Sequence, residues 1–225
     1  MATVVQPPPT IDIERLPSHG SGGGRNLIPP GGDLRKVKSN SPPPASTGIW
    51  VGLASIAMTF AAFTSALVVR QGSATDWQHF PLPPVLYLNT LVIIASSITL
   101  ETARRRAPAF MSNLQRGGTP AASPARWLYL TLGLGLLFVT GQTFAWMQLR
   151  SEGFTLATNI SYSFFYVLTV AHAIHLVGGI GGLVRVVLKF QHGTLKRTTL
   201  DATSRYWHFM GVLWVYLLFL LWLKL

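Results

Sequence analysis

The chain has 225 residues, of which 49% are apolar and only 11% carry a charge, and its mean hydropathy is positive. This composition favours a polytopic membrane protein over one soluble domain. The net charge of +11 does not indicate a nucleic-acid partner, because the Lys and Arg residues lie between apolar runs and do not cluster on one face. The absence of cysteine from the sequence excludes disulfides, iron–sulfur ligation and thiolate-bound copper or zinc.

The first 47 residues differ in composition from the rest of the chain. They contain nine Pro, six Gly and no aromatic residue. Such a segment cannot bury enough apolar surface to offset its chain entropy. We expect residues 1–47 to form a Pro/Gly-rich cytoplasmic extension, either solvated or lying along a partner, and residues 48–225 to form a membrane domain.

Five apolar segments follow this extension. A membrane helix needs roughly 20 residues to cross a hydrocarbon core of about 30 Å. The connection Phe80 to Pro84, with the sequence FPLPP, cannot continue a helix and separates the first two segments. The last segment has Trp207 near its start and Trp222 near its end, where amphipathic rings rest at the headgroup level. The predicted fold is all-α, with transmembrane helices over residues 48–70, 85–103, 127–149, 159–189 and 205–225.

The distribution of Lys and Arg predicts the orientation of these helices. Five lie before the first segment, five in 104–126 and five in 185–205, against Arg70, Arg150 and Lys224 on the other side. Cytoplasmic loops carry the excess of basic residues. We therefore expect a cytoplasmic N-terminus and an external C-terminus.

The segment 159–189 carries small and polar residues on one helix face. Spacings of three, three, four and three residues place together Thr169, His172, His175, Gly179 and Gly182. Gly178 and Gly182 form a small-xxx-small pair, which lets a neighbouring helix approach closely. We take as candidates for packing or lipid contact His172, His175, Gly178, Gly179, Gly182, Trp207 and His208.

Histidines inside a membrane are functional candidates by default, so His172, His175 and His208 are candidate ligands of a cofactor. Two histidines one turn apart cannot take opposite axial sites of one haem, and His208 lies about ten residues away in depth, or roughly 15 Å at helical rise. Two histidines without a nearby carboxylate also fall short of the ligands that zinc or copper requires. We interpret them as structural histidines that hydrogen-bond across helices, with no metal or haem in this chain.

A second polar cluster is expected near the cytoplasmic ends of three helices. Glu101, Arg185 and His208 fall at similar depth, and a carboxylate there is costly unless it is paired. One hypothesis is that Glu101 pairs with Arg185 or His208. The alternative is that Glu101 reaches the aqueous interface beside the arginines at 104–106.

Local sequence in all five segments resembles subunit III of the haem–copper oxidase superfamily, which includes cytochrome c and quinol oxidases and the accessory subunit of nitric oxide reductases. The resemblance covers residues 48–225. The matching stretches are Trp50 to Ser55, Pro81 to Thr90 with Ser96 to Leu100, Gly135 to Gln142 ahead of Trp146, Phe165 to Gly179, and Tyr206 to Phe209 with Trp214. The shorter bacterial members of this family also have five helices.

The resemblance implies a non-catalytic subunit of a terminal oxidase of the cytochrome c oxidase type. Such a chain packs against subunit I, with subunit II and small subunits nearby, and holds phospholipid, while haem and copper belong to partner subunits. The alternatives are an accessory subunit of a nitric oxide reductase, or an autonomous haem b membrane protein.

Two departures from the family pattern affect the expected role. Family members commonly have an acidic residue where this chain has Ile56, and Val-Asp where it has Met210 and Gly211. Neither Ile nor Gly can titrate. The resemblance therefore implies a structural and lipid-organising role here, without proton collection by those two side chains.

Overall fold

The computed structural model describes residues 44–73, 77, 82–115, 123–154 and 159–224. Its helices are α1 (Pro44–Ser73), α2 (Val85–Gln115), α3 (Ala125–Ser151), α4 (Ile160–Gln191) and α5 (Arg197–Lys224). The described part contains no strand, and all five helices are long and apolar enough to cross a membrane. The predicted all-α fold with five membrane helices is confirmed. The expected extension 1–47 lies outside the described residues, except that α1 already begins at Pro44.

The helices are longer than the hydropathy pattern predicted, and the largest extensions are at the end of α2 and the start of α5. The end of α2, expected near Ala103, lies at Gln115, beyond Pro108. The start of α5, expected at Arg205, lies at Arg197. Polar residues mark where a helix leaves the hydrocarbon core. The helix itself can continue beyond that point, because its backbone hydrogen bonds do not depend on the polarity of the side chains. The extension of α2 is also held by packing, since the rings of Phe110 and Phe190 lie 5.8 Å apart.

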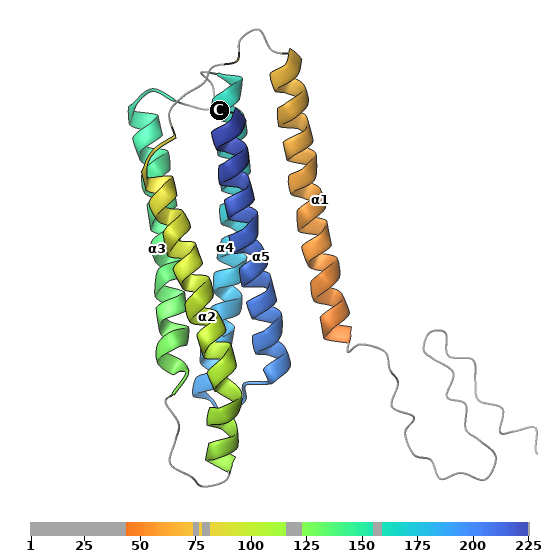
Figure 1. Cartoon of the computed structure of the whole chain (residues 1–225), viewed down its shortest axis with the longest axis vertical. Coiled ribbons are helices and arrows are strands. Elements are labelled where there is room, and N and C mark those ends of the chain that lie inside the picture. Colours follow the sequence, from red (N-terminus) through yellow and green to blue (C-terminus); the bar gives the residue numbers. More distant parts are fainter. Residues whose placement is uncertain (1–43, 74–76, 78–81, 116–122, 155–158, 225) are drawn as a thin grey trace, which may run out of the picture. The chain divides into compact units, whose positions relative to one another are not determined.

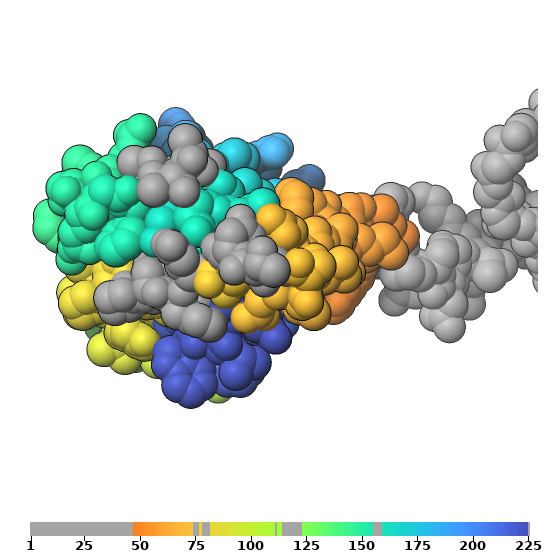
Figure 2. Space-filling view, turned by 90° about the horizontal axis from the view of Figure 1, so that it is seen from above, coloured from red at the N-terminus to blue at the C-terminus, as the bar shows by residue number. Residues whose placement is uncertain are grey.

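Four of the helices form a bundle, and α1 lies beside it (Figure 1). Contacts join α2 to α3 and α5, α3 to α4, and α4 to α5, whereas α1 contacts only α5 and α4. The view from above shows α1 at the edge of the bundle, beside the C-terminal part of α5 (Figure 2). Many side chains of α1 are consequently exposed, including Trp50, Val51 and Met58.

Large aromatic side chains fill the centre of the bundle. Trp207 and Trp214 from α5 are fully buried, as are Phe138 from α3 and Phe165 from α4. Both indoles donate hydrogen bonds to α2: Trp207 Nε1 to Ser96 Oγ at 3.1 Å and Trp214 Nε1 to Thr90 Oγ1 at 3.0 Å. Because buried indole N–H groups need acceptors, these two bonds fix the rotation of α5 against α2.

Candidate functional site: the α2–α5 groove

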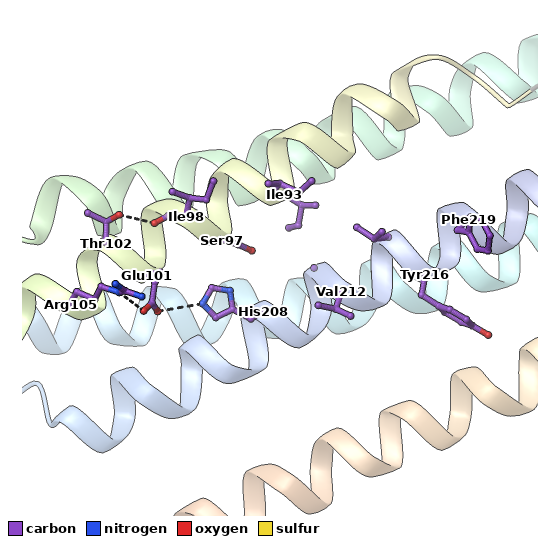
Figure 3. Close-up of a pocket in the computed structure, with 13 residues that line it drawn as sticks. Ile93, Ser97, Ile98, Glu101, Thr102, Arg105, His208, Val212, Tyr216 and Phe219 are labelled. Carbon is purple, nitrogen blue, oxygen red and sulfur yellow. Dashed lines mark hydrogen bonds and ion pairs between the residues drawn. The ribbon is translucent and has the colours of Figure 1, made fainter.

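A groove of about 910 Å³ runs along the outer surface between α2 and α5 (Figure 3). From α2 it is lined by Ile93, Ile94, Ser97, Ile98, Glu101, Thr102 and Arg105, and from α5 by His208, Gly211, Val212, Val215, Tyr216 and Phe219. Most of this lining is aliphatic or aromatic, and the charged groups lie together at one end. The groove is thus amphipathic along its length.

Gly211 allows the two helices to come close at the floor of the groove. A Cβ placed on Gly211 would lie 3.3 Å from Ser97 Oγ, which is tighter than ordinary van der Waals contact. Gly211 is also the position where the family commonly has Asp. A carboxylate side chain would enter this narrow space, so its absence leaves the floor of the groove uncharged.

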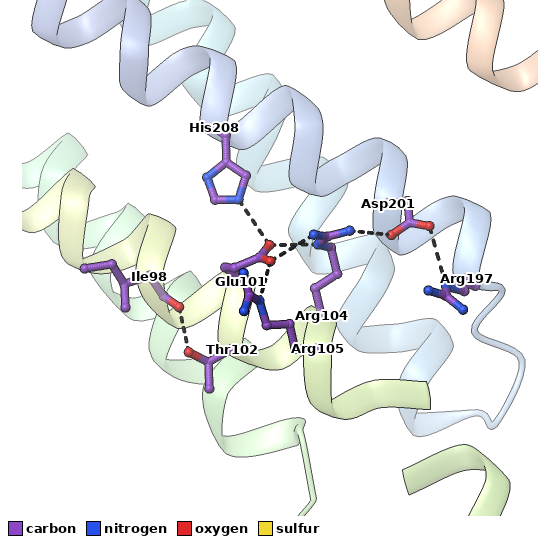
Figure 4. A network of polar contacts seen from close by, with 8 residues as sticks. All are labelled: Ile98, Glu101, Thr102, Arg104, Arg105, Arg197, Asp201 and His208. Carbon is purple, nitrogen blue, oxygen red and sulfur yellow. Dashed lines mark hydrogen bonds and ion pairs between the residues drawn. The ribbon is translucent and has the colours of Figure 1, made fainter. Parts of the chain in front are cut away.

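The polar end of the groove is a network centred on the carboxylate of Glu101 (Figure 4). Arg104 reaches it with Nε at 2.7 Å and Nη2 at 2.9 Å, and Arg105 with Nε at 2.8 Å. His208 Nε2 on α5 lies 3.7 Å from Glu101 Oε2. Arg104 also donates to Asp201 of α5 at 3.3 Å. The network therefore joins α2 to α5 through charged groups from both helices.

Helical spacing explains why these residues meet. Arg104 and Arg105 follow Glu101 by three and four positions, so all three lie on one face of α2. Asp201 likewise has Arg197 four positions before it on α5, at 3.9 Å. These six residues carry three guanidinium groups against two carboxylates, with one histidine. Arg105, whose side chain is 78% exposed, places an accessible cation at the mouth of the groove.

Of the two partners hypothesised for Glu101, the structure brings only His208 near. Arg185 is exposed on α4, and among the described residues Glu101 forms ion pairs with Arg104 and Arg105, while His208 Nε2 lies 3.7 Å away and pairs with it only when that ring is protonated. The contacts of Glu101 with the arginines that follow it, expected in the alternative, are shorter than its contact with His208. His208 thus lies near Glu101 and Arg185 is outside the cluster, whereas the placement of Glu101 at the aqueous interface stays a prediction.

The histidines of α4 do not hydrogen-bond across helices as expected. His172 is fully buried, and neither ring nitrogen has a partner among the described residues. Nδ1 of His175 lies 2.7 Å from the carbonyl oxygen of Ala171, within the same helix. Helix contact is made instead by the Tyr206 hydroxyl, which donates to the backbone carbonyl of His175 at 2.8 Å. No group of three or more His, Cys, Asp or Glu side chains in the described part is arranged to hold a metal ion.

The glycines of α4 contact side chains of α5 and not its backbone. A Cβ on Gly179 would lie 3.0 Å from the ring of Tyr206 and 3.3 Å from that of Trp207. A Cβ on Gly182 would lie 3.6 Å from Thr203 Cγ2, and one on Gly178 would lie 3.9 Å from the Tyr206 hydroxyl oxygen. Because these glycines have no side chain, this face of α4 leaves room for the aromatic rings of α5, which pack against it.

The resemblance implied a lipid-holding groove, but its position between α2 and α5 was not predicted from the sequence. Its α2 wall follows spacings of three and four residues through Ile94, Ser97, Glu101 and Arg105, which is a signal that the sequence contains. Such a stripe does not identify a groove, because lipid-facing and partner-facing sides of a membrane helix are similarly apolar.

The fold and site together define a class: an all-helical, multi-pass membrane protein with an amphipathic groove on the surface between two of its described helices. The family model described as "Cytochrome c oxidase subunit III" matches residues 51–224. The chain therefore belongs to the cytochrome c oxidase subunit III family. The subunit III resemblance seen in the five segments is confirmed.

Individual relatives support the same family. The chain is similar to cytochrome c oxidase subunit 3 of Corynebacterium diphtheriae, with 30% identity over 190 residues, covering 80% of this chain and 88% of the relative. It is 32% identical over 185 residues to a probable cytochrome c oxidase subunit 3 of Mycobacterium tuberculosis, covering 78% and 86%. The protein of that name from Thermostichus vulcanus is 27% identical over 183 residues, covering 78% and 85%. Membership identifies this chain as subunit III of a terminal oxidase, which functions in a complex with other oxidase subunits.

Proposed function

We propose that this chain is a non-catalytic subunit that stabilises a dioxygen-reducing cytochrome c oxidase by binding subunit I and phospholipid. Haem and copper belong to partner subunits, with subunit II and small subunits completing a complex in the bacterial plasma membrane. The observation that carries the proposal is the α2–α5 groove, which combines an apolar wall with a cationic end. The names of the relatives favour this oxidase over a nitric oxide reductase.

The dimensions and chemistry of the groove suit a phospholipid. Aliphatic side chains such as Ile94, Ile98 and Val215 offer contact to an acyl chain along the membrane normal. Arg105 stands at the end where the headgroup of that lipid would lie, and a basic residue near an anionic surface contributes about 1 kcal/mol. We place subunit I over this groove, with the lipid between the two proteins.

The role proposed for this chain in proton translocation is indirect. Ile56 is partly buried on α1 and Gly211 lies at the floor of the groove, and neither can exchange a proton. The proton entrance therefore belongs to subunit I, and subunit III with its lipid steadies the structure around that entrance.

A pair of tryptophan variants tests whether the groove is the binding surface. Val212 is 70% exposed and lines the groove, whereas Val177 is 55% exposed on α4 and does not line it. Val212→Trp should obstruct the groove, so the purified oxidase should lose both subunit III and tightly bound phospholipid in native mass spectrometry. Val177→Trp, the matched control, should leave both amounts unchanged.

Three results would contradict the proposal. The first is a Val212→Trp complex with the full complement of subunit III and lipid, and the second is an equal loss caused by Val177→Trp. The third is haem bound at unit stoichiometry by the isolated chain, which would favour an autonomous haem b protein.

A further inference from the structure

Two uncharged polar side chains are buried at the centre of the bundle without a partner. Gln142 on α3 is 1% exposed and His172 on α4 is fully buried. Both amide atoms of Gln142 and both ring nitrogens of His172 lack a hydrogen-bond partner among the described residues. Four buried polar atoms on two adjacent helices therefore need an explanation.

The packing of α3 against α4 places these two side chains at the same level. On one side of Gln142, Trp146 Nε1 donates to Thr169 Oγ1 at 3.1 Å. On the other side, the Phe138 ring lies 6.1 Å from the ring of His172. Gln142 is four residues from both Phe138 and Trp146, and the helices run in opposite directions, so Gln142 faces the turn of α4 that carries His172.

Aromatic side chains surround the ring of His172 on other sides. The rings of Phe60, Phe138 and Trp214 lie 6.5, 6.1 and 5.1 Å from that of His172. The Trp214 N–H is already used by Thr90. None of these neighbours offers the amide or the imidazole a conventional hydrogen bond.

Leaving these groups unpaired is costly. The Gln142 amide has two donor hydrogens and an acceptor oxygen, and a neutral imidazole has one donor and one acceptor nitrogen. In an apolar membrane interior each unsatisfied group costs several kcal/mol. Gln142 cannot relieve this cost by changing its charge, so a small polar molecule with both donors and acceptors fits the site.

We propose that Gln142 and His172 form a binding site for an internal water molecule between α3 and α4. Water both donates and accepts, and buried waters typically make about three hydrogen bonds to groups that lack protein partners. The bridge would join the two helices one turn away from the direct hydrogen bond between Trp146 and Thr169. The water site is independent of what occupies the α2–α5 groove, so either proposal can fail alone.

A cryo-EM map of the unmodified oxidase complex, at a resolution that shows ordered water, tests the site directly. We expect a density peak within about 2.7–3.2 Å of one His172 ring nitrogen and one Gln142 amide atom. A direct hydrogen bond between the two side chains, or a space between them without density, would overturn the proposal.

A double-mutant cycle tests it energetically. Gln142→Leu and His172→Phe should each lower the temperature at which the subunit leaves the complex, because each leaves polar groups unpaired. The double variant should lower this dissociation temperature by less than the sum of the two single shifts, since both partners are then apolar. Trp146→Phe with Thr169→Val, a pair joined by a direct bond, provides the reference cycle. Additive shifts for Gln142 and His172, with a coupled reference pair, would contradict the bridge.

Discussion

At the scale of single residues, Trp207 connects four parts of the molecule. Its ring packs against Gly135 of α3 and Gly179 of α4, and its N–H donates to Ser96 of α2. It is fully buried, although the sequence suggested that a Trp near the start of the last segment lies at the headgroup level. The two glycines leave the volume that the indole fills.

Gly135→Ala is therefore expected to destabilise the bundle. Its Cβ would lie 2.8 Å from Trp207 Cη2, and a rigid, fully buried indole cannot move away without disturbing its other contacts. Overpacking of this kind typically costs about 1–3 kcal/mol. The measurement is the thermal stability of the purified complex.

Gly133→Ala on the same helix is the matched control. A Cβ there would meet nothing within 4 Å, and alanine favours helix over glycine by about 1 kcal/mol. The control should leave the melting temperature unchanged or slightly raised. Equal melting temperatures for the two variants would show that Trp207 does not pack tightly against α3.

At the scale of elements, polar contacts with α5 attach the C-terminal half of α1 to the bundle. Gln71 Nε2 in the last turn of α1, and Trp77 Nε1 four residues beyond its end, both donate to the carbonyl oxygen of Lys224, at 3.2 and 3.0 Å. Along the helix, the Tyr216 hydroxyl of α5 bonds to Thr64 Oγ1 at 3.1 Å. The last turn of α5 thus holds α1, whose N-terminal half is largely exposed.

Removing the two donors to Lys224 should loosen the end of α1. In the variant Gln71→Leu with Trp77→Phe, the aromatic ring beside Phe164 is retained, but both N–H groups are lost. We expect faster hydrogen exchange of α1 backbone amides near residue 70, measured by mass spectrometry, because local opening becomes easier.

Ser73→Ala serves as the control, since that hydroxyl is exposed and bonds only to carbonyls of its own helix. Its exchange should match that of the unmodified chain. If the α1 amides of the double variant exchanged as slowly as those of the unmodified chain, the bonds to Lys224 would not be what holds α1.

At the scale of the whole molecule, the orientation in the membrane remains a prediction from charge. Fifteen Lys and Arg residues fall on one side of the five predicted spans and three on the other. The two ends of α3 lie on opposite sides in this scheme, with Ser123 just before its start and Ser151 at its end.

The chain has no cysteine, so single-cysteine variants can test this orientation. Ser151→Cys should react with a membrane-impermeant maleimide in intact cells, because the end of α3 is expected outside. Ser123→Cys should react only in inside-out vesicles. Both serines are exposed, so accessibility within the protein does not differ between them. The opposite labelling pattern would reverse the topology.

The number and type of the secondary-structure elements could be predicted from the sequence alone. Length and apolar composition of a span are local properties, and a lipid interior tolerates only backbone whose hydrogen bonds are satisfied within the segment. Five apolar runs therefore had to form five helices. The cluster at Glu101 was also partly predictable, because residues at spacings of three and four meet on any helix.

The rotation of each helix about its axis, and the positions at which α2 ends and α5 begins, could not be predicted from the sequence and are seen only in the folded structure. The structure placed His208 beside Glu101 and left Arg185 exposed. It also buried Gln142 and His172 without a hydrogen-bond partner among the described residues. In a membrane, the buried and lipid-facing sides of a helix are similarly apolar, so hydropathy does not specify rotation. Rotation follows from packing between distant segments, such as the fit of Trp207 between Gly135 and Gly179.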